Sequence, residues 1–109
     1  MVNSKIVWTK FAASELKNIY QFYKQSASIS VARKIKERIY ESVKQLQNHP
    51  LSGAIEDNLS DANFIYRYLV EGNYKIIYRQ NNEIIYIIDV FDCRRNPQDM
   101  QFGIGGLKG

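Results

Sequence analysis

The first part of the chain carries an apolar pattern typical of a helix. Apolar residues recur one, three or four positions apart, which places them on one side of a helix and predicts that this side is buried. These residues are Phe11, Ala12, Leu16, Ile19, Tyr20 and Tyr23. We expect this helix to span residues 10–25, with Thr9 capping its first turn. The β-branched and aromatic segment Lys5–Trp8 before it predicts a strand.

A second helix is predicted after a short break at residues 26–28. Ser28 or Ser30 can cap its start, and Asn48-His49-Pro50 ends it, because a proline pushes the preceding residue out of the helical conformation. Its apolar positions are three or four residues apart: Ala32, Ile35, Ile39, Val43 and Leu46. Two helices joined by so short a turn predict a helical hairpin.

From residue 64 onward the apolar period changes to two, which predicts strands. We expect three of them, over residues 64–70, 74–80 and 83–91. The segments between them are Glu71-Gly72-Asn73 and Asn81-Asn82, whose residues tolerate the positive φ of tight turns. An antiparallel meander is therefore expected.

Both faces of the middle strand carry apolar side chains. One face has Tyr74, Ile76 and Tyr78, and the other has Lys75, Ile77 and Arg79. We therefore expect the helices to cover one face of the sheet and the other face to be partly exposed. The predicted fold is α+β in the order β-α-α-β-β-β, a helical hairpin packed on a small, mainly antiparallel sheet. The segment 51–63, which is acidic, is predicted to be a loop.

Length and composition predict one domain. The 109 residues suit a single core over residues 1–102, and residues 103–109, with four of the six glycines, are expected to be a flexible tail. Cys93 is the only cysteine, which excludes a disulfide framework, and no phosphate-binding loop or metal motif is present, so we expect neither cofactor nor metal. No signal peptide or membrane-spanning segment is seen, so a cytoplasmic protein is expected.

The net charge and its distribution give little indication of where a functional site lies. The net charge is +4, but the stretch from residue 64 to 97 has five basic and four acidic residues, so it is not a simple basic funnel. Five of the eight tyrosines fall in the predicted strands, and most are expected in the core: Tyr66, Tyr68, Tyr74, Tyr78 and Tyr86. The basic second helix is either a solvated face or a patch for an acidic partner. Neither His49 nor Cys93 has a partner that suggests catalysis.

Several segments together resemble a known family. They are Arg67-Tyr68-Leu69-Val70-Glu71-Gly72-Asn73-Tyr74-Lys75-Ile76-Ile77-Tyr78, the apolar strand 84–90, and Arg94-Arg95-Asn96-Pro97. Trp8-Thr9 and His49-Pro50-Leu51-Ser52-Gly53 lie at matching places around the helices. In this order and spacing the chain resembles the RelE/ParE toxin superfamily, and most closely its ParE-like plasmid-stabilisation branch.

The resemblance implies a bacterial type II toxin, neutralised by a cognate antitoxin that wraps onto it. ParE-like members poison DNA gyrase by binding, whereas RelE-like members cut messenger RNA on the ribosome. The resemblance also implies assembly as a homodimer or a toxin-antitoxin hetero-oligomer. A third hypothesis, of another class, is a non-toxic interaction module whose basic second helix docks an acidic partner.

The chemistry of RNA cleavage helps to choose between the two toxin branches. Attack by the RNA's own 2′-hydroxyl needs a base, an acid and cations around the phosphate. The resemblance implies that a member of the nuclease branch carries a tyrosine or histidine near the C-terminus, and none follows Tyr86 here. A nuclease would therefore have to use Asp92 as its base and find its acid elsewhere, with Arg67 and Lys75 as its cations. The leading hypothesis is therefore a non-enzymatic gyrase inhibitor whose target-binding residues are Arg67, Lys75, Arg94 and Arg95.

Overall fold

The structure is a computed structural model that describes residues 4–59 and 64–96. The expected tail at residues 103–109 and Pro97 lie outside these ranges. In chain order the elements are β1 (Lys5–Trp8), α1 (Lys10–Ser26), α2 (Ile29–Lys44), the short 3-10 helix η1 (Gln45–Gln47), β2 (Ala54–Ile55), β3 (Tyr66–Glu71), β4 (Tyr74–Asn81) and β5 (Ile84–Asp92).

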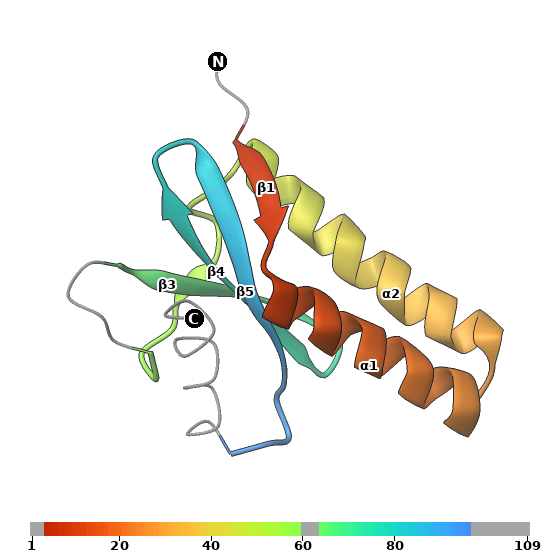
Figure 1. The fold of residues 1–109 in the computed structure, drawn as a ribbon. Coiled ribbons are helices and arrows are strands. Elements are labelled where there is room, and N and C mark those ends of the chain that lie inside the picture. The colour runs from red at the N-terminus through yellow and green to blue at the C-terminus, as the bar shows by residue number, and fades with distance from the viewer. Residues whose placement is uncertain (1–3, 60–63, 97–109) are drawn as a thin grey trace.

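The described strands form one sheet with the helical hairpin on one of its faces (Figure 1). The strand order is β1-β5-β4-β3-β2, and only the pair of β1 and β5 is parallel. The predicted α+β class is confirmed. The prediction missed β2, which lies within the expected loop and pairs antiparallel with β3 through Ala54 and Ile55.

Both predicted helix caps are present. The Thr9 hydroxyl accepts a hydrogen bond from the Ala12 N–H at 3.2 Å and donates one to the carbonyl of Ile87 at 2.8 Å, so this cap also ties α1 to β5. Ser28, rather than Ser30, caps α2 and accepts from the Val31 N–H at 3.0 Å. Each cap satisfies a backbone donor that the first turn of a helix leaves without a partner.

The sheet is packed on both faces. The helical face carries the main core, in which β4 contributes Tyr74, Ile76 and Tyr78 as predicted. The opposite face, termed the far face, carries a second cluster of buried residues: Leu59, Tyr66, Ile77, Ile88 and Phe91. The alternation along β4 is thus confirmed, and the three most buried strand tyrosines are Tyr66, Tyr74 and Tyr78.

The turns of the meander contain the positive φ angles that the sequence predicts. Gly72 has a φ of 58° and Asn82 a φ of 57°. A β-bulge was not predicted: Ile77 lies opposite Asp89 but Tyr78 lies opposite Ile87, so β5 carries one extra residue, Ile88. The bulge resets the alternation of β5 immediately before Asp89, which is buried.

Candidate functional site

Arg67, one of the four cations expected to bind the target, is held by the segment that precedes β2. Its Nη1 donates to the carbonyl of Gly53 at 3.0 Å, and the Gly53 N–H donates to the Tyr78 hydroxyl at 2.9 Å. A Cβ at position 53 would lie 2.6 Å from that hydroxyl, so only glycine fits there. Arg67 therefore has a structural role in holding the loop to the sheet.

Lys75 lies on the far face and forms an ion pair with a buried carboxylate. Its Nζ is 2.9 Å from Glu56 Oε1 and 4.3 Å from the centre of the Tyr68 ring. Glu56 is only 2% exposed, and its other oxygen accepts from the N–H and side-chain amide of Asn58. Burial alone would raise the pKa of Glu56, but the hydrogen bonds from Lys75 and Asn58 outweigh it and lower that pKa. The charge of Lys75 is thus largely neutralised within the chain.

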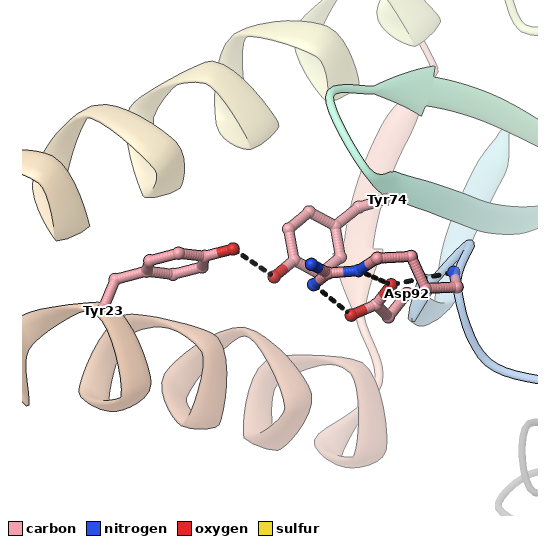
Figure 2. Close-up of polar contacts among 4 residues, drawn as sticks. Tyr23, Tyr74 and Asp92 are labelled. Carbon is pink, nitrogen blue, oxygen red and sulfur yellow. Dashed lines mark hydrogen bonds and ion pairs between the residues drawn. The ribbon is translucent and has the colours of Figure 1, made fainter. Parts of the chain in front are cut away.

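Arg94 forms a two-point ion pair with Asp92 at the end of β5. Arg94 Nε lies 2.9 Å from Oδ1 and Nη2 lies 2.6 Å from Oδ2, and the Arg94 N–H also donates to Oδ1 (Figure 2). The hydrogen bond from the Arg94 side chain is the main reason that the pKa of Asp92 is lowered. A carboxylate held in this way is a weak proton acceptor.

A groove of about 230 Å³ separates α1 from the end of β5. We term it the arginine groove; its lining residues are Glu15, Asn18, Ile19, Phe22, Tyr74, Val90, Asp92, Arg94 and Arg95. Phe22, one of these lining residues, is 60% exposed. The Tyr74 hydroxyl donates to that of Tyr23 at 3.4 Å, and burial, followed by this contact, raises the pKa of Tyr74 (Figure 2). Exposed cations, an exposed aromatic ring and the buried Tyr74 thus line one groove.

Asp89 was not predicted as a site residue, although it is the acidic residue within the apolar segment 84–90. Its side chain is 3% exposed, and its Oδ1 is buried without a hydrogen-bond partner. Its pKa is raised to about 7, mainly by burial and further by the nearby negative charge of Glu15, while Arg95 acts in the opposite direction. The Arg95 guanidinium lies 5.2 Å from the centre of the Phe91 ring. A buried carboxyl is therefore held beside the arginine groove.

The structure brings together only part of the expected site. Arg94 and Arg95 share the arginine groove with Asp92. Arg67 lies opposite Tyr78, whereas Asp92 lies opposite Tyr74, four residues along β4. Lys75 is on the far face, next to Glu56 and Tyr68. The residues that a nuclease would need, Asp92, Arg67 and Lys75, do not share one surface.

The described residues offer little other chemistry. Across residues 4–59 and 64–96, no group of three or more His, Cys, Asp or Glu side chains could hold a metal ion. Cys93 is an exposed free cysteine, and the His49 N–H donates to the carbonyl of Gln45, the first residue of η1. No helix in these ranges is long and apolar enough to cross a membrane.

Comparison with known proteins identifies the family. The model of the family described as "ParE toxin of type II toxin-antitoxin system, parDE" matches residues 6–97. The chain belongs to the ParE toxin family. A solved structure, "Chromosomal ParDE TA system from P. aeruginosa", is 25% identical to this ParE-family chain, covers 82% of it and 95% of its own chain, and superposes with a TM-score of 0.67. A search of curated proteins finds no match.

The family assignment confirms the resemblance seen in the sequence. The match begins in β1 and extends through the whole meander to Pro97, so it includes both the arginine groove and the helical hairpin. The ParE-family chain is the toxin component of a type II toxin-antitoxin system.

Proposed function

We propose that this ParE-family toxin acts by binding DNA gyrase in the cytoplasm and that a cognate antitoxin neutralises it. The arginine groove carries this proposal, because Arg94 and Arg95 are exposed there beside the exposed ring of Phe22. Arginine and aromatic side chains on one surface are typical of the residues that dominate protein-protein binding energy. We therefore propose Arg94 and Arg95 as the main contact residues.

Arg67 and Lys75 take a smaller part in this proposal than the sequence suggests. Both side chains are already bound to the segment between residues 53 and 58, through the Gly53 carbonyl and the Glu56 carboxylate. A target could use them only after breaking contacts that the fold itself needs. We expect their substitution to act on stability before it acts on target binding.

The chemistry of the groove favours binding over cleavage of messenger RNA. A nuclease needs a general base, and the ion pair with Arg94 lowers the pKa of Asp92. The raised pKa of Tyr74 keeps its hydroxyl protonated at neutral pH, so Tyr74 does not supply a phenolate base. These features support an inhibitor that acts by occupying its target.

The proposal is tested by the double variant Arg94→Ala/Arg95→Ala. Expressed without antitoxin, the wild-type chain should stop growth and induce the DNA damage response, and purified toxin should inhibit gyrase supercoiling. The double variant should lose both effects while keeping its fold. Arg33→Ala/Lys34→Ala is the matched control, because it removes two adjacent exposed cations from α2.

Other outcomes would reject the proposal in distinct ways. Codon-phased cuts in messenger RNA with intact DNA would favour the RelE-like nuclease. A wild-type chain with no effect on growth would favour the non-toxic interaction module. If the Arg94 and Arg95 variant unfolds, the two arginines are structural residues.

A further inference from the structure

Arg79 is a cation of the far face that has no acidic partner among the described residues. It lies in β4, opposite Tyr66 of β3 and Tyr86 of β5. The ion pairs of the described residues do not include Arg79. Two of its guanidinium nitrogens, Nε and Nη1, are buried without a hydrogen-bond partner. Because a buried charged donor without an acceptor costs free energy, these nitrogens favour the binding of an anion.

Two aromatic rings flank the Arg79 guanidinium and hold it in place. Its central carbon lies 4.0 Å from the ring centre of Phe64 and 4.6 Å from that of Tyr86. Rings at these distances attract a cation, but they offer no oxygen that could accept its N–H groups. The side chain is therefore ordered before any ligand arrives, which lowers the entropy that binding costs.

Lys75, on the same face of β4, shows how the chain treats a cation that it neutralises itself. Lys75 and Arg79 are four positions apart, so their side chains point to the same face of the strand. Lys75 also lies over an aromatic ring, that of Tyr68, but in addition it pairs with the carboxylate of Glu56. Arg79 has the rings without the carboxylate. An oxyanion for Arg79 therefore has to come from outside the described chain.

The chemistry of the site favours a small phosphate ligand. A guanidinium presents its N–H groups as a planar fork that matches two oxygens of a phosphate or carboxylate. A phosphate group carries more negative charge than a carboxylate and has three acceptor oxygens, so it gains more from an unneutralised cation. A nucleic-acid strand fits less well, because it needs a row of free cations and free rings. Here Phe64, Tyr68 and Tyr86 already contact cations of the chain, and Glu56 neutralises Lys75.

We infer that Arg79 binds the phosphate group of a small ligand, either inorganic phosphate or a phosphate monoester, in the plane of its guanidinium. The unpartnered Nε and Nη1 donate to the phosphate oxygens, and Phe64 and Tyr86 keep the guanidinium in place. Arg79 and both rings are only partly buried, so a small rotation of either ring opens the two nitrogens to an anion from solvent.

The phosphate site and the arginine groove lie on opposite faces of the sheet. Tyr74, which lines the arginine groove, is the first residue of β4 and belongs to the core on the helical face. Arg79 is five positions further along β4, and the alternation of the strand places it on the far face. A small ligand on Arg79 therefore leaves the arginine groove open. The inference goes beyond the proposed function and does not depend on it.

The test titrates the purified chain with inorganic phosphate and follows its arginine Nε–H signals by NMR at neutral pH and constant ionic strength. The Arg79 signal should shift along a saturable curve with a Kd of about 1 mM. Arg79→Met removes the charge but keeps an apolar stem, and it should weaken phosphate binding, measured by calorimetry, at least about tenfold. The matched control is Arg33→Met, the same change at an exposed position of α2, which should alter the Kd by less than about twofold.

Two further probes separate the sources of the phosphate group. Adenosine monophosphate that binds clearly more tightly than inorganic phosphate would identify a phosphate monoester as the ligand, and equal affinities would identify free phosphate. Acetate that binds as tightly as phosphate would overturn the assignment to phosphate. A short single-stranded oligonucleotide that binds far more tightly than adenosine monophosphate would overturn the small ligand and assign the far face to nucleic acid.

The variants decide whether Arg79 itself is the site. Unchanged phosphate affinity in Arg79→Met would overturn the inference, and equal weakening in Arg33→Met would show that only net charge matters. If Arg79→Met fails to fold by circular dichroism, Arg79→Lys decides, because it keeps the charge between the rings and loses only the planar fork. It should bind phosphate at least about threefold more weakly than the wild type, and an unchanged Kd would reject Arg79 as the phosphate-binding residue.

Discussion

Asp89 makes the stability of this protein depend on pH in an unusual direction. Folding raises its pKa from 3.8 to about 7, because the carboxyl is buried and one of its oxygens has no hydrogen-bond partner. Between these values the folded state holds a proton that the unfolded state has lost. The native state is therefore most stable below pH 3.8 with respect to this group, and it loses stability as the pH rises to about 7.

The size of this effect follows from the change in pKa. One pKa unit corresponds to about 1.4 kcal/mol, so ionised Asp89 destabilises the fold by about 4 kcal/mol above neutral pH. Near pH 5 the cost is about 1.6 kcal/mol, since the unfolded carboxyl is already ionised. Asp89→Asn removes the charge but leaves amide donors to satisfy, at a cost of about 1–2 kcal/mol that does not vary with pH.

Urea denaturation at two pH values tests this reasoning. The free energy of unfolding of Asp89→Asn, relative to the wild type, should rise by about 3 kcal/mol between pH 5 and pH 8.5. Asp57→Asn, at an exposed position in the loop before β3, makes the same chemical change outside the core and is the matched control. If the difference in free energy of unfolding between Asp89→Asn and the wild type is the same at both pH values, the carboxyl is not protonated in the folded state and the reasoning is refuted.

Three further substitutions test how the loop and the first helix are held. Lys75→Met leaves Glu56 buried without its cation and should lower the free energy of unfolding, measured in urea, by about 3 kcal/mol. The double variant Glu56→Gln/Lys75→Met should recover most of this loss. No recovery would contradict the ion-pair account. Gly53→Ala puts a Cβ 2.6 Å from the Tyr78 hydroxyl and should lower the melting temperature by roughly 5 °C or more, so an unchanged Tm would mean that the loop can move away. Thr9→Ala should cost about 1–2 kcal/mol by chemical denaturation, whereas Thr9→Ser, which keeps the hydroxyl, should cost clearly less.

The helices and the meander were predictable because their signals are local. An apolar period of three to four residues and a hydroxyl before the first turn are enough to place α1 and its cap at Thr9. Gly72 and Asn82 marked both turns of the meander. In contrast, β2 has only two residues, too few to show any period, and it exists because β3 offers it a free edge.

The candidate site was less predictable because its contacts are non-local. Lys75 and Glu56 are 19 positions apart, and the residues next to each of them do not indicate that the two form an ion pair on the far face. The bulge at Ile88 depends on the register between β4 and β5, so the burial of Asp89 could not be read from alternation alone. Arg94 and Arg95 were identified through the family resemblance, whereas the ion pair of Arg94 with Asp92 required the structure.

The pairing of β1 with β5 has a consequence for how the toxin is made. Lys5 lies beside Ile84 in a parallel ladder, so the first strand of the domain acquires its neighbour only after the last strand has left the ribosome. Contacts between such distant parts of a chain form late and slowly, because a long loop must close first. A nascent toxin therefore remains without its completed sheet through most of its synthesis. An antitoxin already present in the cell has that interval in which to meet the emerging chain.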